Sequence, residues 1–127
     1  MPLVTITVRK RKSVAFTSAI LAAVHQGLIG AGVPETDRFQ RVVQLSADEF
    51  QYDGRYPDVA SARNDDFVLI EILWPVGRSV KVKRKVLADV VAQIARDPGV
   101  DPEHVMVVFK ETAWENWSFA GGRLLHA

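Results

Sequence analysis

Two parts of this chain repeat the same series of structural signals at a nearly constant distance. Ser13 and Ser79 are of a residue type that caps helix amino termini, and each precedes a stretch with apolar residues at helical spacing. Gly32-Val33 and Gly99-Val100 follow these stretches, and a β-branched run comes after each. The serines are 66 residues apart and the glycines 67. The sequence therefore predicts a duplicated β-α-β unit.

Hydrophobic periodicity places the strands of both units. Residues 3–8 have β-branched side chains with a period of two, which is typical of a strand. Residues 67–74 are almost continuously apolar, as in a central strand that is buried on both faces. Residues 38–45 and 104–109 complete the set of expected strands. Right-handed crossovers then put both helices on one face of a four-stranded sheet, which is an α+β fold.

The other face of this sheet has no helix to cover it. Because both predicted helices cover the opposite face, self-association is the natural way to bury the helix-free face, and we expect an oligomer.

We interpret the chain as one domain, residues 1–127. Its parts are repeat one at 2–46, an inserted excursion at 47–66, repeat two at 67–112 and a C-terminal segment at 113–127. The excursion contains the turn signals Asp53-Gly54, Tyr56-Pro57 and Asn64-Asp65-Asp66, and we expect a short hairpin there.

Charge and composition exclude several classes of function. The net charge is +1, from 16 basic and 15 acidic residues, so there is no general attraction to nucleic acid or to an anionic membrane. The cations Lys81, Lys83, Arg84 and Lys85 are best explained as a solvated helix face, and no glycine-rich phosphate loop accompanies them. Without a signal peptide or an apolar run of membrane-spanning length, we expect a cytoplasmic location.

The sequence gives no basis for a metal site or another cofactor. The chain has no cysteine, and its three histidines are spread over a helix, the start of a strand and the tail, as His25, His104 and His126. No two of them have the spacing of metal ligands on a helix. We therefore expect chemistry without a cofactor.

Pro2 is the candidate for such chemistry. Removal of Met1 would make Pro2 the first residue, with a secondary amine that can act as a compact base. An α-amino group titrates near pH 8, and apolar surroundings favour its neutral form, so general base catalysis near pH 7 is feasible. If Met1 stays attached, the nitrogen is an amide and cannot act as a base. The alternative is that Pro2 merely begins an edge strand.

Asp37 and Arg78 are further candidates, and each has an alternative explanation. Asp37 follows Pro34 and could be an ordinary turn residue. Arg78 stands at a helix start, where a cation is disfavoured by the helix dipole, and this favours a functional role. Trp114 and Trp117 could belong to the core or to an interface, as large aromatic residues often do.

Pro2 and three motifs together resemble the tautomerase superfamily along nearly the whole chain, and most closely its malonate semialdehyde decarboxylase-like group. The motifs are Gly32-Val33-Pro34 with Asp37-Arg38-Phe39-Gln40, then Gly77-Arg78-Ser79, then Asn116-Trp117-Ser118-Phe119 leading into Gly122-Arg123.

The resemblance implies a role for each matching residue. Pro2 matches the catalytic proline, and Asp37 matches an aspartate that activates water or supports the proline. Arg78 matches an arginine that binds the substrate carboxylate. Trp117 and Phe119 match part of an aromatic wall that keeps the pocket dry.

Val76 is the main departure from the pattern of that group. It stands where the decarboxylase has the first arginine of an Arg-Pro-Arg turn, and Gly77 replaces the proline. The loss of one guanidinium removes a bidentate carboxylate contact, which argues against malonate semialdehyde itself as substrate. The first-repeat counterpart of Arg78 is Lys12 or Arg11, so another cation could come from the run 9–12.

The resemblance implies a cofactor-free enzyme that acts on a small oxo or unsaturated carboxylic acid and assembles as a homotrimer. Neutral Pro2 would carry out keto-enol tautomerisation, and protonated Pro2 with Asp37 would support hydration or decarboxylation. Two alternatives stay open: a non-catalytic ferredoxin-like binding module, and a trimeric scaffold that has lost activity.

Overall fold

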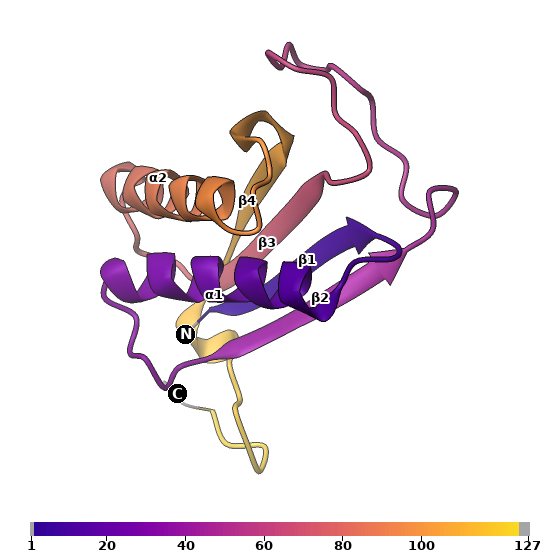
Figure 1. The fold of residues 1–127 in the computed structure, drawn as a ribbon. Helices are drawn as coiled ribbons and strands as arrows, with labels where there is room; N and C mark the ends of the chain where they lie inside the picture. The colour runs from indigo at the N-terminus through magenta and orange to yellow at the C-terminus, as the bar shows by residue number, and fades with distance from the viewer. Residues whose placement is uncertain (1, 125–127) are drawn as a thin grey trace.

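The computed structural model describes residues 2–124 and shows one β-α-β unit on each side of an excursion. The elements in chain order are β1 (Leu3–Arg9), α1 (Val14–Gly30), β2 (Phe39–Leu45), β3 (Val68–Pro75), α2 (Val80–Arg96), the 3-10 turn η1 (Pro102–His104), β4 (Val105–Thr112) and the 3-10 turn η2 (Trp114–Asn116). Figure 1 shows the resulting arrangement, with both helices in front of the sheet.

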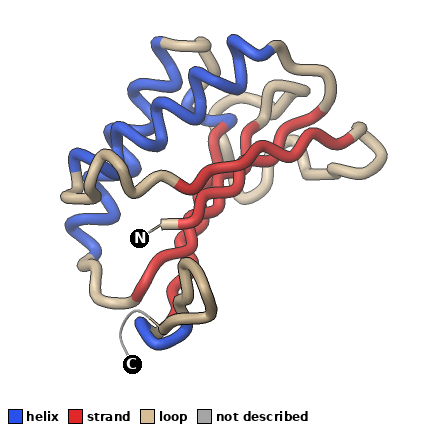
Figure 2. Tube along the Cα trace, turned by 90° about the horizontal axis from the view of Figure 1, so that it is seen from below, coloured by secondary structure: helices blue, strands red, loops and turns tan. Residues whose placement is uncertain are grey.

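The strands form a four-stranded sheet in the order β2-β1-β3-β4. Strands β1 and β2 are parallel, as are β3 and β4, while β1 and β3 are antiparallel. Both helices lie on the same face, as Figure 2 shows from below. The α+β fold with duplicated β-α-β units is thus confirmed.

The two repeats agree in the hydrogen bonds that begin and end their helices. Ser13 Oγ accepts from the amide of Phe16 at 3.1 Å, and Ser79 Oγ accepts from the amide of Val82 at 3.2 Å. A glycine with positive φ, a conformation that L residues rarely adopt, follows within three residues of the end of each helix, with φ of +100° at Gly32 and +95° at Gly99. Each repeat therefore has a serine cap at the start of its helix and a glycine between the helix and the next strand.

The core lies between the sheet and the helices. The helix-facing side chains of β1 and β3 are fully buried, as the alternation of a strand requires. Where the helices cross, α1 presents Gly27 to Val90 of α2, and a Cβ at Gly27 would lie 2.6 Å from Val90 Cγ2. This glycine thus sets how closely the two helices approach. The buried apolar side chains of the strands and helices are Val4, Ile6, Val8, Ile20, Ala23, Val24, Leu28, Val68, Ile70, Ile72, Trp74, Val86, Val90 and Ile94.

The excursion corrects one expectation. Its residues form turns and bends and no strand, so the expected hairpin is wrong. Polar links hold it to the sheet instead: Arg9 pairs with Asp65 at 2.7 Å and Lys12 with Asp66 at 3.0 Å. Aromatic contacts add to these links, because the ring of Tyr52 lies 4.4 Å from that of Phe67.

Two smaller details also differ from the expectations. Strand β1 is internal in the sheet, so Pro2 does not begin an edge strand. His104 ends η1 and is buried, while β4 begins one residue later. Neither of the helices in the described part of the chain is long and apolar enough to cross a membrane.

Candidate active site

Four separate segments meet at one end of the sheet. Strands β1 and β2 begin there, whereas β3 and β4 end there, because β3 runs antiparallel to β1. The register places Leu3 opposite both Phe39 and Leu73. The topology thus brings the amino terminus, the loop before β2, the loop after β3 and the segment after β4 together, although they are far apart in sequence.

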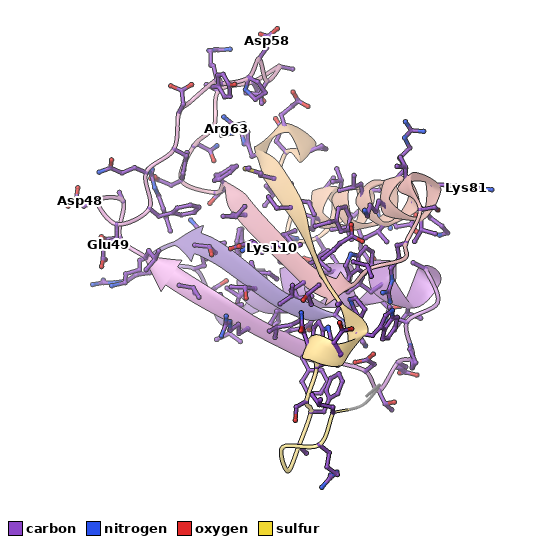
Figure 3. All side chains as sticks on the ribbon, turned by 180° about the vertical axis from the view of Figure 1, so that it is seen from behind. Asp48, Glu49, Asp58, Arg63, Lys81 and Lys110 are labelled. Carbon is purple, nitrogen blue, oxygen red and sulfur yellow. The ribbon has the colours of Figure 1, made fainter. Side chains whose placement is uncertain are left out.

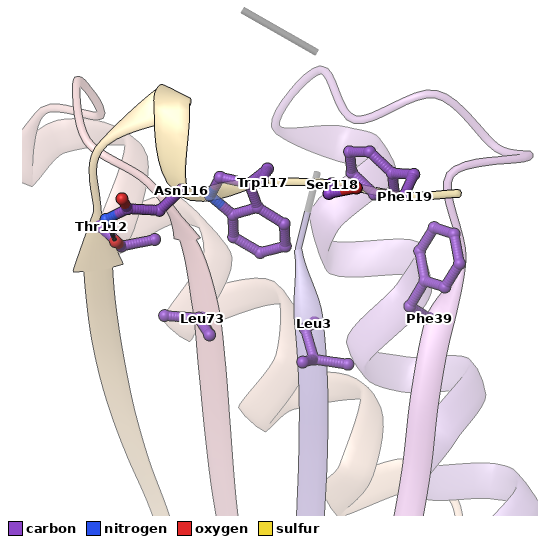
Figure 4. Close-up of a pocket in the computed structure, with 8 residues that line it drawn as sticks. All are labelled: Leu3, Phe39, Leu73, Thr112, Asn116, Trp117, Ser118 and Phe119. Atoms are coloured by element: carbon purple, nitrogen blue, oxygen red, sulfur yellow. Dashed lines mark hydrogen bonds between the residues drawn. The ribbon is translucent and has the colours of Figure 1, made fainter. Parts of the chain in front are cut away.

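A cavity of about 530 Å³ opens at this end, on the face of the sheet that carries no helix. Leu3, Leu73 and Phe39 project from the strands, and Trp117 and Phe119 lie across them, as Figure 4 shows. The ring of Phe119 is 5.6 Å from that of Phe39 and 5.8 Å from that of Trp117. The remaining lining residues are Thr112, Asn116 and Ser118. The cavity therefore has apolar walls with a few polar groups at one side.

The aromatic wall was predicted only in part. Trp117 and Phe119 line the cavity, and so do Leu3, Phe39 and Leu73, which were given no role in the site. These three occupy one row across the sheet. A sequence shows such a row only when strand register is known, which is why it was missed.

Arg78 follows β3 and is partly buried. Its Nη1 donates to the carbonyl of Pro75 at 2.8 Å, and its guanidinium carbon lies 4.7 Å from the ring centroid of Trp74 and 6.0 Å from that of Trp114. Burial lowers the pKa of Arg78, while the negative charges of Glu111 and Asp37 oppose this shift. The guanidinium thus lies near two indole rings in a place with reduced access to water.

Asp37 is close enough to act on Arg78 electrostatically. It is partly buried, and its amide donates to the carbonyl of Pro34 at 3.0 Å, so it also has the role in the turn that its position indicated. The structure therefore brings together Asp37 and Arg78, which are 41 residues apart in the sequence.

Pro2 is buried and directly precedes Leu3, which lines the cavity. Alternation along β1 gives Pro2 the orientation of Val4, toward the helices, and Leu3 the opposite one. Pro2 thus adjoins the cavity along the chain but is not one of the residues that line it. Val76 is 46% exposed and donates its amide to the carbonyl of Thr112 at 3.0 Å. Like Asp37 and Arg78, it is not one of the residues that line the cavity.

Within one chain, the basic run 9–12 does not provide a cation in place of the arginine that Val76 replaces. It follows the far end of β1, six residues beyond Leu3, or roughly 20 Å along an extended strand. Arg9 and Lys12 already pair with carboxylates of the excursion. Among residues 2–124, no group of three or more His, Cys, Asp or Glu side chains could hold a metal ion.

Comparison with known proteins identifies the class of protein that has this fold and site. A family model described as "Tautomerase enzyme" matches residues 37–120, which is more than half of the chain. The chain belongs to this family and is an enzyme of the tautomerase type. A "Probable tautomerase RSp1151" of Ralstonia nicotianae is 28% identical over 53 residues, which cover 42% of this chain and 82% of that protein.

Solved structures give a more particular likeness. Malonate semialdehyde decarboxylase superposes with a TM-score of 0.87 and 27% identity, over 96% of this chain and 93% of the other. FG41 malonate semialdehyde decarboxylase inhibited by 3-bromopropiolate also gives 0.87, with 26% identity over 96% and 92% of the two chains. A fused 4-OT, described as a symmetric trimer, gives 0.76 at 18% identity over 96% and 94%, which shows the fold alone.

Proposed function

We propose that Pro2, freed by removal of Met1, acts as the base or acid on a small oxo or unsaturated carboxylic acid. The observation that carries this proposal is the burial of Pro2 directly before Leu3, which lines the apolar cavity. The cavity offers an apolar wall for the carbon skeleton of a substrate. Arg78, which is close enough to Asp37 to interact with it electrostatically, offers a cation for a carboxylate.

The surroundings favour a neutral amine at Pro2. A terminal amine titrates near pH 8 in water, and burial disfavours its charged form. Neutral Pro2 can accept a proton from the carbon next to a carbonyl and return it to another atom, which is keto-enol tautomerisation. This is the reaction that we infer first.

Arg78 binds the substrate carboxylate in this proposal. A guanidinium matches a carboxylate with two parallel hydrogen bonds, and such bonds are stronger where water is excluded. The indole rings of Trp74 and Trp114 support the guanidinium from the protein side. Because Arg78 already has a protein scaffold, it need not be reorganised when the substrate arrives.

Asp37 would allow the site a second type of reaction. If Pro2 is protonated, it can polarise a carbonyl or an alkene while Asp37 directs water, which would give hydration or decarboxylation. Val76 limits this route, since a single arginine holds the carboxylate where the related decarboxylase pattern has two. We therefore favour an oxo acid or enol other than malonate semialdehyde.

We also propose that the chain assembles as a homotrimer through the helix-free face of its sheet. That face leaves Phe39 and Met106 each 47% exposed, and a fused 4-OT of the same fold is described as a trimer. A neighbouring subunit would then help to enclose the cavity. Sedimentation equilibrium should give three times the mass of one chain, and a monomer mass would contradict this assembly.

The role of Pro2 is tested by two variants with a matched control. Pro2→Ala and a variant with one additional residue before Pro2 should each lose most turnover of enol and oxo acids, because the first replaces the secondary amine and the second converts it into an amide. Pro102→Ala, in the exposed turn η1, should keep full activity. Full activity in either amino-terminal variant would remove Pro2 from the mechanism.

A further inference from the structure

Glu111 is a carboxylate of the protein that lies near Arg78 on the helix side of the sheet. It stands opposite Trp74 in the pairing of β3 with β4, and the guanidinium carbon of Arg78 lies 4.7 Å from the ring centroid of Trp74. The preceding residue of β4, Lys110, projects from the other, helix-free face, which Figure 3 shows with Lys110 labelled. Burial lowers the pKa of Arg78, and the nearby charge of Glu111 opposes this shift. Glu111 is therefore an anion that could compete with a substrate for Arg78.

Lys83 of α2 holds the carboxylate of Glu111. Its Nζ donates to Glu111 Oε1 at 2.9 Å, and the two side chains are only 24% and 30% exposed, so salt screens this pair less than a fully exposed one. Arg78 instead donates to the carbonyl of Pro75 at 2.8 Å, which uses one of the five guanidinium N–H groups. The cation of Lys83 thus pairs with the carboxylate, while the guanidinium is bonded to a neutral group.

The position of Lys83 indicates that this pair serves more than the helix. Lys83 lies at the end of the first turn of α2, which has no acidic residue, and a cation near the amino end of a helix is disfavoured by the helix dipole. Its partner is on β4, 28 residues away in the sequence. By contrast, Lys85 pairs with Asp89 within α2, four residues along the helix. The Lys83–Glu111 pair therefore connects α2 to the strand that lies beside Trp74 and Arg78.

We propose that Lys83 keeps the carboxylate of Glu111 paired away from Arg78, so that the guanidinium stays free to bind the carboxylate of the substrate. This inference rests on the proposed function, in which Arg78 binds that carboxylate. Without the charge of Lys83, Glu111 would be an unpaired anion that attracts Arg78 and repels an anionic substrate. Both effects weaken binding. Lys83 and Glu111 are thus positioning residues, and neither has to touch the substrate.

The neighbouring turn makes this arrangement consequential. Val76 leaves Arg78 as the single arginine between β3 and α2. A carboxylate of the protein that engaged Arg78 would therefore remove the cation that this turn offers. In a turn with two arginines, one of them could pair with Glu111 while the other bound the substrate. The need for Lys83 thus follows from the same departure that sets this chain apart from the decarboxylase pattern.

Binding of an unreactive acid tests the inference without any turnover. The probe is 3-phenylpropanoate, which has a carboxylate and an aromatic ring but no oxo group, and its Kd is measured by calorimetry at fixed ionic strength. Lys83→Met should raise the Kd by about 5- to 10-fold, as expected for one unpaired charge several ångströms away at a partly shielded site. The double variant Lys83→Met/Glu111→Gln should restore the Kd of the unmodified protein. Lys85→Met, which removes the cation of the other ion pair on α2, should leave the Kd unchanged.

The double variant decides between this role and its alternatives. Weak binding that persists in Lys83→Met/Glu111→Gln would overturn the inference, because Lys83 would then attract the carboxylate directly or merely support the end of α2. Unchanged binding in Lys83→Met, weaker binding in Glu111→Gln alone, or an equal loss in Lys85→Met would overturn it too.

Arg78→Gln separates this inference from the proposed function. If Arg78→Gln loses affinity for 3-phenylpropanoate while Lys83→Met does not, the carboxylate-binding role of Arg78 stands and the role of Lys83 is overturned. If Arg78→Gln binds the probe as tightly as the unmodified protein, or if neither binds it, both are overturned.

Discussion

Replacement of Arg78 should weaken the recognition of carboxylates far more than it weakens the fold. The guanidinium is partly buried and supported by Trp74 and Trp114, so its hydrogen bonds to a substrate form where water is scarce. A hydrogen bond to a charged group contributes about 1.5–3 kcal/mol. After desolvation is deducted, a two-bond contact is worth about 2–4 kcal/mol, which is about 30- to 1,000-fold in kcat/KM.

Two substitutions at Arg78 separate charge from geometry. Arg78→Gln removes the charge and should lower kcat/KM by the full factor of about 30 to 1,000. Arg78→Lys keeps the charge but loses the planar fork, and it should lower kcat/KM by about tenfold. Ketonisation of the enol of phenylpyruvate, followed by ultraviolet absorbance, gives both values. The methyl ester of the same enol has no carboxylate and should be affected little by either substitution.

The control for this series is Arg84→Gln, which removes an exposed cation from α2 and should leave kcat/KM unchanged. Thermal unfolding of every variant shows whether the fold is retained. Equal losses for the acid and its ester would refute the reasoning, because they would mean that Arg78 supports the structure of the site and not the carboxylate. An unchanged kcat/KM for the acid in Arg78→Gln would refute it as well.

Three further predictions concern stability. Gly27→Ala should lower the free energy of unfolding by about 1–3 kcal/mol, because the new Cβ would meet Val90 Cγ2 at 2.6 Å. Gly30→Ala, at an exposed position in the same helix, should leave the free energy of unfolding unchanged or raise it. Equal effects of the two substitutions in urea unfolding would contradict the role of close helix packing. Ser79→Ala should lower the free energy of unfolding by about 1 kcal/mol, because it removes the side-chain cap of α2. An unchanged midpoint of thermal unfolding would show that the cap does not stabilise the protein. The pKa of Asp101 is lowered by hydrogen bonds from the amide of Glu103 and the hydroxyl of Ser61. The contribution of Asp101 to the free energy of unfolding is therefore present above the unfolded pKa of about 4 and is lost as the pH falls through the folded pKa. Asp101→Asn should flatten the pH dependence of stability in that acid range, and an unchanged slope would contradict the assignment.

The fold could be predicted from the sequence because its strongest signals are local and occur twice. The caps at Ser13 and Ser79 and the glycines with positive φ at Gly32 and Gly99 each fix a boundary within a few residues of chain. Crossover handedness then leaves few ways to arrange two such units. The excursion was harder to predict, because Asp53-Gly54 indicates a turn but does not determine whether the flanking residues pair as strands.

The candidate site could be predicted only where a motif marked it. Trp117 and Phe119 belong to a motif, and the structure places both in the cavity wall. Phe39 and Leu73 become neighbours of Leu3 only through the register of three strands. Long-range pairing of this kind leaves no pattern in one segment of sequence.

The most direct test of the proposed mechanism is the pH dependence of covalent labelling at Pro2. The untagged protein would be treated with 3-bromopropiolate over a range of pH, and the adduct would be located by intact-mass and peptide mass spectrometry. The proposed function predicts loss of Met1 and a single adduct on Pro2, with an apparent pKa well below that of a free prolyl amine. Retention of Met1, or labelling with the pH profile of an ordinary exposed amine, would contradict the central role of Pro2.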